Sequence, residues 1–263
     1  MLSFQDHLDH LTEDEDTPFE KRDICWYLSQ PNERKLMRAL VYMDHGATEK
    51  VHPTVQGHMR AILKWFETRG TDKVWLPKLM EMLKCPNRAD WTMYKGGIIY
   101  RGIHRSWSEL KKLKYTGKVS KDSHMTAFVA DGVYTSRYSF QSWTSDWKIG
   151  VRFANNPNHP AAVNPALERD IGIVCEAKVD PKDTLFNPEI CRKLSDYGSE
   201  KEVIRTSNEP LPIKVYVNVS SFEKALGSIA SREGRMLELA KLVGDANAKI
   251  LAKTPLMKAI LQH

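Results

Sequence analysis

The stretch FQSWTSDWKIGVRFA, residues 140–154, joins two local patterns that indicate the fold. Its first half has the character of a short strand, and Thr144 or Ser145 can cap a following helix with Asp146 in the first turn. Its second half carries one apolar helical face, made of Trp147, Gly150, Val151 and Ala154. The stretch therefore predicts a corner at which a strand passes directly into a helix.

Segments on both sides of this corner have the patterns of strands. Residues 97–102 form a short apolar run between glycines, which indicates a buried strand. Residues 171–179 and 213–219 alternate apolar and polar side chains, as half-buried strands of antiparallel sheets do. We expect Gly172 and Val174 on the solvent side of their strand. Residues 155–170 are rich in Asn and Pro and predict a mobile loop.

Helical periodicity dominates the two ends of the chain. The N-terminal part carries the apolar stripe Leu36, Ala39, Leu40 and Met43, followed by predicted helices over residues 53–68 and 76–83. Near the C-terminus a further stripe consists of Leu239, Leu242, Val243 and Ala246. We therefore predict an α+β protein with a helical region (1–90), a core rich in strands (91–220) and C-terminal helices packed on that core (221–263).

Composition places the chain among ordinary globular proteins. It has 263 residues, 41% of them hydrophobic and 27% charged, and no apolar run approaches the length of a membrane span. Residues 1–7 lack the basic head and apolar core of a secretory signal, so we expect a cytoplasmic protein, including the cytoplasm of an infected or intoxicated host cell. The four cysteines are far apart, which predicts reduced thiols, no disulfide and no metal site.

The chain is basic, with a net charge of +6 and a pI near 9.0. A positive charge favours acidic partners such as nucleotides, nucleic acid or acidic protein surfaces. The densest group of cations is Lys111, Lys112, Lys114, Lys118 and Lys121. We expect either a solvated helix face and loop, or contact with nucleic acid through Lys111, Lys112 and Lys114.

Three short segments carry residues suited to chemistry. Arg101, after Tyr100 and before Gly102, can present a planar fork to a phosphate, and the glycine lets backbone approach a ligand. Ser142, Trp143 and Thr144 form the second segment. The third contains Glu200 and Glu202, whose carboxylates point the same way if the chain between them is extended. Each segment alone has an ordinary structural explanation.

Together, and in this order, the segments resemble the R-S-E class of mono-ADP-ribosyltransferases, in the style of bacteriophage and bacterial-toxin enzymes. Arg101 matches the aromatic-Arg motif, residues 142–144 match an S-T-S-like strand, and Glu200-Lys201-Glu202 matches E-x-E. Trp143 departs from the S-T-S pattern. The resemblance covers about residues 92–220 and implies a core of two mainly antiparallel sheets around a cleft for NAD⁺.

The resemblance also implies roles for these residues. Arg101 would hold the NAD⁺ pyrophosphate together with Gly102 and the segment Ser142, Trp143 and Thr144. Ser142 would orient Glu202, which would bind the ribose 2′-hydroxyl and stabilise the cation formed as nicotinamide leaves. Glu200 would orient and deprotonate the acceptor, an arginine of a target protein. Phe140 or Tyr138 would stack on nicotinamide, or would equally belong to the core.

Other functions remain open at this point. The chain could hydrolyse NAD⁺ with water as the acceptor, or transfer ADP-ribose or an NAD-capped RNA in a reaction that involves nucleic acid. A basic nucleic-acid-binding or virion structural protein would explain the charge but not the three motifs. His104 is expected to be exposed, and no metal is expected, because His7 and His10 lack further ligands nearby.

Overall fold

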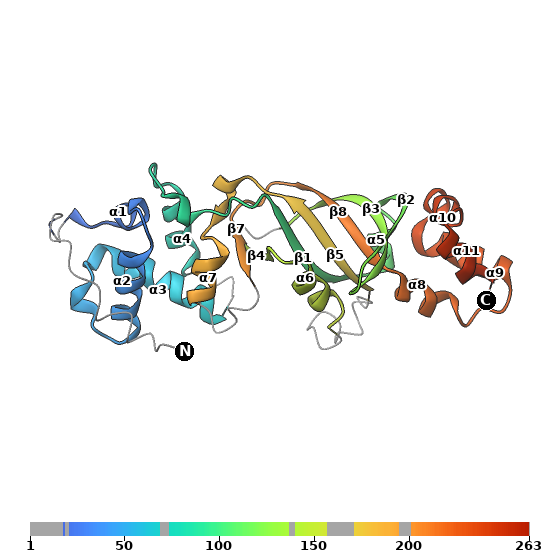
Figure 1. The fold of residues 1–263 in the computed structure, drawn as a ribbon, viewed down its shortest axis with the longest axis horizontal. Helices are drawn as coiled ribbons and strands as arrows, with labels where there is room; N and C mark the ends of the chain where they lie inside the picture. Colours follow the sequence, from blue (N-terminus) through green and yellow to red (C-terminus); the bar gives the residue numbers. More distant parts are fainter. Residues whose placement is uncertain are drawn as a thin grey trace. The chain divides into compact units, whose positions relative to one another are not determined.

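The computed structural model describes residues 18, 21–68, 74–136, 140–156, 171–194 and 201–262. The chain divides into two compact units (Figure 1), each built from separate stretches of sequence. Unit 1 comprises residues 1–95, 140–142 and 180–207. Unit 2 comprises residues 96–139, 143–179 and 208–263.

Unit 1 begins with a layer of helices. They are α1 (Ile24–Ser29), α2 (Arg34–Asp44), α3 (Pro53–Thr68) and α4 (Leu76–Leu83), with the 3₁₀ turns η3 (Thr48–Lys50) and η4 (Asp90–Thr92). The three helices predicted from apolar periodicity are confirmed as α2, α3 and α4. Their inward side chains, among them Leu36, Met59, Ile62 and Met82, are buried in one core.

A segment distant in sequence completes unit 1. It contains η6 (Pro181–Asp183), β6 (Thr184–Leu185), α7 (Pro188–Leu194) and β7 (Glu202–Arg205). The Arg88 guanidinium donates to the carbonyls of Thr184 (3.0 Å) and Lys182 (3.1 Å). The backbone N–H of Phe186 donates to the Thr92 carbonyl (2.7 Å), and the Phe186 ring is buried in the core. These bonds fix residues 182–186 on the helical layer.

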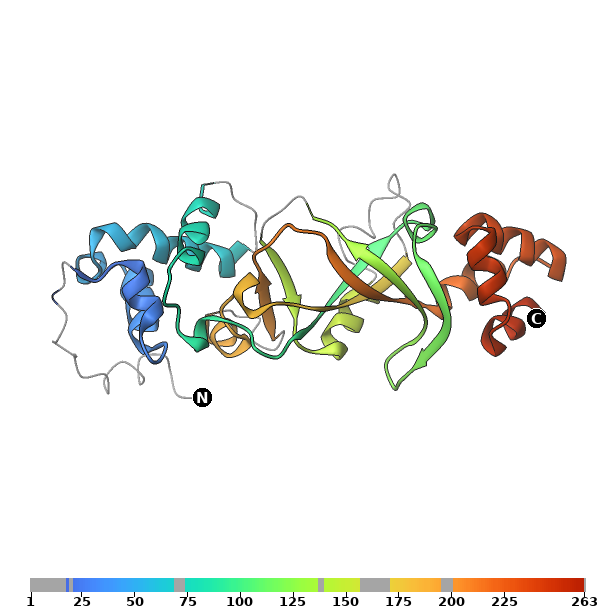
Figure 2. The same ribbon diagram turned by 90° about the horizontal axis from the view of Figure 1, so that it is seen from above.

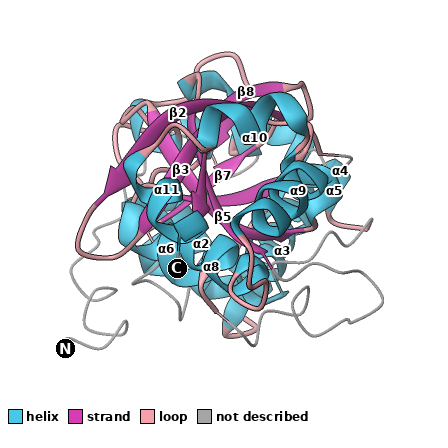
Figure 3. Ribbon diagram, turned by 90° about the vertical axis from the view of Figure 1, so that its right-hand side faces the viewer, coloured by secondary structure: helices cyan, strands magenta, loops and turns pink. Residues whose placement is uncertain are grey.

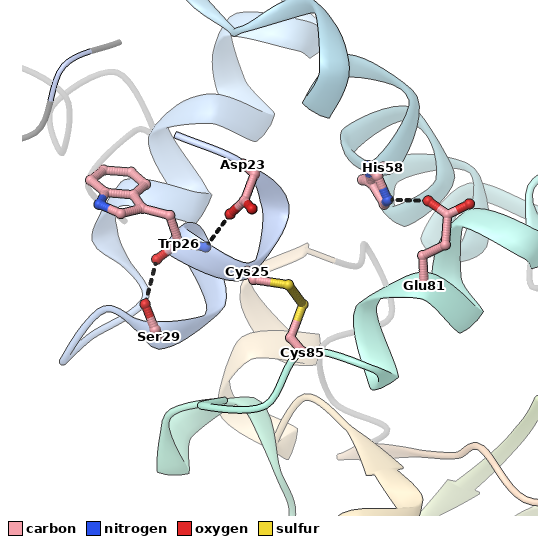
Figure 4. The surroundings of a disulfide bond; sticks show 7 residues. All are labelled: Asp23, Cys25, Trp26, Ser29, His58, Glu81 and Cys85. Atoms are coloured by element: carbon pink, nitrogen blue, oxygen red, sulfur yellow. Dashed lines mark hydrogen bonds and ion pairs between the residues drawn. A yellow bond between two sulfur atoms is a disulfide. The ribbon is translucent and has the colours of Figure 1, made fainter. Parts of the chain in front are cut away.

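Unit 1 also contains a disulfide bond (Figure 4). Cys25 at the start of α1 is bonded to Cys85 just after α4, with a Cα–Cα distance of 5.2 Å. The prediction of reduced thiols is therefore wrong for this pair, because α1 and α4 pack together and bring residues 60 positions apart into bonding distance. Cys175 and Cys191 are buried and do not belong to this disulfide.

The strands of unit 2 form an antiparallel arrangement (Figures 1 and 2). Their order is β2-β3-β8-β5-β1-β4, whereas in unit 1 the order is β4-β7-β6. The pairs β2–β3, β3–β8, β8–β5, β5–β1, β1–β4 and β7–β6 are antiparallel. The strands of unit 2 are β1 (Ile98–Arg105), β2 (Lys114–Lys121), β3 (Thr126–Tyr134), β5 (Ile171–Lys178) and β8 (Leu211–Asn218). Strand β4 (Gln141–Thr144) has its first two residues in unit 1 and its last two in unit 2.

The described strands belong to one eight-stranded sheet, so the protein is α+β as predicted, but the expected two sheets are not seen. Within unit 2, Thr144 of β4 pairs with Tyr100 of β1. Within unit 1, the Arg205 side chain of β7 donates to the Gln141 side chain.

Helix α6 (Trp147–Ala154) follows β4 directly, which confirms the predicted corner. It packs on β1 and β5 with almost no space between the backbones. A Cβ at Gly102 would lie 2.0 Å from the carbonyl oxygen of Gly150, and one at Gly172 would lie 1.9 Å from that of Ala154. Val174 is consequently buried under α6 and does not face solvent, so the predicted exposed side of its strand is wrong.

The helices α5 (Trp107–Leu110), α8 (Val219–Leu226), α9 (Arg232–Val243), α10 (Asp245–Leu251) and α11 (Pro255–Gln262) complete unit 2. The last four appear together in Figure 3. The predicted C-terminal stripe is broken at Gly244, whose φ of 85° ends α9 and begins α10, so that Ala246 lies exposed on a different helix from Leu239. No helix in the described ranges combines the length and apolar character that a membrane span requires.

Candidate functional site

Arg101 lies in the middle of β1, opposite Cys175 of β5. Its guanidinium carbon is 5.7 Å from the centroid of the Tyr134 ring, at the end of β3. The Nη1 atom is buried and has no hydrogen-bond partner among the residues that the structure describes. Because a buried donor without a partner is costly, this nitrogen is a candidate for binding an anionic ligand.

Two aromatic side chains support this arginine. Tyr134 is buried and packs edge-on against Trp143, with ring centroids 5.1 Å apart and an interplanar angle of 71°. Trp143 is only 2% exposed. The tryptophan that departs from the S-T-S pattern therefore fills the space behind Tyr134, and an arginine above an aromatic face gains a cation–π contact.

The neighbouring Tyr100 serves a different purpose. Its ring packs edge-on against Trp147 of α6, with centroids 5.6 Å apart. Burial is the largest cause that raises the pKa of Tyr100, followed by the charges of Glu176 and Asp146. The tyrosine of the aromatic-Arg motif thus anchors β1 under α6.

Strand β4 carries the second motif, which consists of Ser142, Trp143 and Thr144. Ser142 is half-buried and Thr144 is buried. The Thr144 hydroxyl accepts from the Asp146 backbone N–H (3.1 Å), and the Asp146 carboxylate accepts from the Lys148 N–H (2.9 Å). The N-cap of α6 is therefore Asp146 rather than Thr144 or Ser145, and Thr144 holds the backbone of the capping residue.

Glu202 opens β7 and is only 4% exposed. In the same unit, Arg205 Nη1 donates to Gln141 Oε1 over 3.2 Å, and Gln141 Nε2 donates to the Ser207 carbonyl over 2.9 Å. Arg205 and Gln141 therefore share one face of the neighbouring strands β7 and β4. Because side chains alternate along a strand, Ser142 and Glu202 share the opposite face.

The residue between the two glutamates has an unusual backbone. Lys201 has a φ of 46°, in the left-handed region that residues other than glycine rarely adopt. The extended chain assumed for Glu200 and Glu202 is therefore not present at Lys201. Glu200 itself lies outside the described residues, as do Tyr138 and most of the loop predicted over 155–170. Strained backbone of this kind is often found at functional sites.

Three further residues singled out from the sequence have structural roles. Gly102 allows α6 to approach β1, which explains a glycine there without a ligand. Phe140 is 2% exposed and packs against Trp65 (5.7 Å between centroids) in the core of unit 1, the alternative that the sequence left open. His104 is buried opposite Gly172, close to the end of α6, so the expectation of an exposed histidine is wrong.

Sequence reasoning did not single out Tyr134, Gln141 or Arg205. The sequence does contain a pattern that could have identified Arg205. A charged residue directly after the apolar pair Val203-Ile204 must find partners if the strand is buried. Tyr134 had none, since its contact with Arg101 joins two strands that are not neighbours in the sheet.

The thiol of Cys175, which lies opposite Arg101 in the strand register, is not expected to react as a nucleophile. Complete burial raises the pKa of Cys175 to about 12, although the charges of Arg105 and Arg101 oppose the shift. In the described part of the chain, no group of three or more His, Cys, Asp or Glu side chains could hold a metal ion.

Comparisons with protein-family models, curated proteins and solved structures find no match for this chain.

Proposed function

We propose that the chain is a mono-ADP-ribosyltransferase that uses NAD⁺ as its substrate and an arginine of another protein as the acceptor. The observation that carries the proposal lies within unit 1, where Ser142 of β4 and Glu202 of β7 share one face of neighbouring strands. A serine beside a buried glutamate is the pair that the second and third motifs of this class would supply.

The environment of Arg101 fits a phosphate ligand. Its buried Nη1 has no protein acceptor within the described ranges, while Tyr134 holds the plane of the guanidinium from one side. The oxygens of a pyrophosphate would satisfy this donor through charge-assisted hydrogen bonds, which are among the strongest in proteins. In the proposed function Arg101 binds the NAD⁺ pyrophosphate.

Glu202 would act on the bond that breaks. The glycosidic bond between the ribose C1′ and the nicotinamide nitrogen breaks, and nicotinamide leaves with the electron pair. Positive charge then develops on the ribose, and a buried carboxylate is an effective partner for such a charge because the surroundings hold little water. Ser142, on the same face of the adjacent strand, would keep the carboxylate oriented.

The acceptor step would complete the transfer. A guanidinium nitrogen attacks C1′, a new C–N bond forms, and the nitrogen loses a proton. Because an arginine stays protonated under ordinary conditions, a carboxylate must hold it and accept that proton. Glu200 would have this role.

The experiment that tests the proposal separates transfer from hydrolysis. The purified chain is incubated with NAD⁺ labelled in its adenosine part, with and without a free guanidine such as agmatine. We expect nicotinamide release and a labelled guanidine adduct, and mass spectrometry of a treated protein mixture should locate the label on arginine. Nicotinamide release with free ADP-ribose as the sole product would instead identify a hydrolase. The absence of any release would contradict NAD⁺ as the substrate.

A further inference from the structure

The five lysines predicted from sequence as a solvated helix face lie mainly on a strand. Helix α5 ends at Leu110, so Lys111 and Lys112 follow it in a turn, whereas Lys114, Lys118 and Lys121 belong to β2. All five side chains are exposed. Across the residues that the structure describes, none of the five takes part in an ion pair. We call these five residues the lysine surface.

The strand that carries the lysine surface is the last one in the order of unit 2, with β3 as its partner. Helix α10 covers the start of the β2 edge that is not paired with β3. Asn247 accepts from the Tyr115 backbone N–H (3.3 Å) and donates to the Leu113 carbonyl (3.0 Å). Lys249, exposed on the same helix, adds a further cation beside the strand. The backbone at this point is already paired, so the lysine side chains are what the edge offers to a partner.

Nearby acidic groups leave these charges largely uncompensated. Glu109 is held by the backbone N–H of Ser106 in a capping box. Asp122 accepts from the backbone N–H groups of His124 and Met125. Asp131 lies opposite Lys114 in the strand register, without an ion pair between them. Lysines on an outer strand also discourage aggregation, but that purpose does not require the additional charges at Lys111 and Lys112.

The aromatic side chains of this segment are turned inward. Trp107 packs against Phe222 with ring centroids 5.1 Å apart, and Tyr115 packs against the same ring at 6.5 Å. Tyr115 is buried and therefore cannot stack on nucleic-acid bases, and the half-buried ring of Trp107 is in contact with Phe222. The surface therefore offers charge without base recognition.

We propose that the lysine surface binds the phosphodiester backbone of a nucleic acid, independently of base sequence. This inference goes beyond the transferase function and does not depend on NAD⁺. Lys114 and Lys121 lie opposite Asp131 and Thr126, so the strand, with its irregularity between Tyr115 and Val119, extends as far as about six regular residues. That length is roughly 20 Å, which is long enough to meet several successive phosphates. Binding through phosphates alone requires a strong dependence on salt, because each contact releases condensed counterions.

The test measures binding of a fluorescent single-stranded RNA of mixed sequence by anisotropy over a range of salt concentrations. The variant Lys114→Gln/Lys118→Gln should lower the magnitude of the log K against log[salt] slope by about 1.4, roughly 0.7 for each lost phosphate contact. Its affinity near 0.1 M salt should fall on the order of tenfold. Homopolymers of different bases should bind with similar affinity.

Two controls keep the result interpretable. The variant Lys84→Gln/Lys224→Gln removes two exposed lysines elsewhere and should leave the slope unchanged. The variant Lys114→Arg/Lys118→Arg keeps the charges and should bind like the wild type, and thermal melting checks that each variant is folded. An unchanged slope in Lys114→Gln/Lys118→Gln would overturn the proposal. Tight binding of polyglutamate without binding of RNA would also overturn it and point to an acidic protein.

Discussion

At the scale of single residues, the most informative arrangement is the guanidinium of Arg101 above the ring of Tyr134, which in turn rests on Trp143. A planar cation held from one side by an aromatic ring loses little further freedom when it binds a ligand at its edge. The sequence pointed to Arg101 and Trp143 by motif and position. It could not show that Trp143 supports Arg101 through Tyr134, because such a chain of contacts exists only in the folded sheet.

This arrangement predicts the effects of two substitutions at Tyr134. Tyr134→Leu should weaken NAD⁺ binding several-fold because the guanidinium loses an aromatic face worth about 1 kcal/mol. Tyr134→Phe keeps the ring and should bind nearly as well as the wild type. Calorimetric titration with NAD⁺ or ADP-ribose, together with melting curves, separates lost binding from lost folding. Equal affinities for the wild type and a folded Tyr134→Leu protein would show that Tyr134 does not position Arg101.

At the scale of elements, helix α6 lies so close to β1 and β5 that glycines are required beneath it. Apolar periodicity predicted both the helix and the corner before it. The same periodicity assigned Val174 to solvent, because a local pattern does not reveal that a helix will cover the second face of a strand. Gly102 was attributed to ligand contact for the same reason, since the packing of α6 is invisible in the sequence.

A matched pair of glycine substitutions tests this packing. Gly102→Ala places a methyl group 2.0 Å from a backbone oxygen of α6, so it should lower the free energy of unfolding by about 1–3 kcal/mol or more. Gly57→Ala, within α3, meets only the Lys78 side chain at 3.6 Å. That change should be neutral or stabilise by up to about 1 kcal/mol through helix propensity. A fully stable Gly102→Ala protein would contradict the close approach of α6.

The disulfide of unit 1 gives a second prediction at this scale. The bond between Cys25 and Cys85 closes a loop of 60 residues, so its loss should lower the free energy of unfolding by about 4 kcal/mol in the chain-entropy view. Reducing agent should lower the melting temperature of the wild type but not that of Cys25→Ser/Cys85→Ser. A wild-type protein indifferent to reduction would mean that the bond does not form.

At the scale of the whole molecule, the chain builds two units from interleaved stretches rather than from consecutive domains. Sequence patterns located the helices α2, α3, α4 and α6 and the strands β1, β4, β5 and β8, since each of these patterns depends on neighbours a few residues away. They could not assign residues 180–207 to the N-terminal helices, because that assignment rests on contacts such as Arg88 with the Thr184 carbonyl, 96 residues apart.

The central claim is that Glu202 is the carboxylate on which cleavage of NAD⁺ depends, and one substitution tests it most directly. Glu202→Gln keeps the shape of the side chain but removes the charge that would face the developing cation. We predict that nicotinamide release falls by about 10²–10³-fold while the melting temperature stays close to that of the wild type. The measurement is nicotinamide release from NAD⁺ by both proteins under identical conditions. Near-native turnover by a folded Glu202→Gln protein would contradict the assignment of Glu202 and the transferase function built on it.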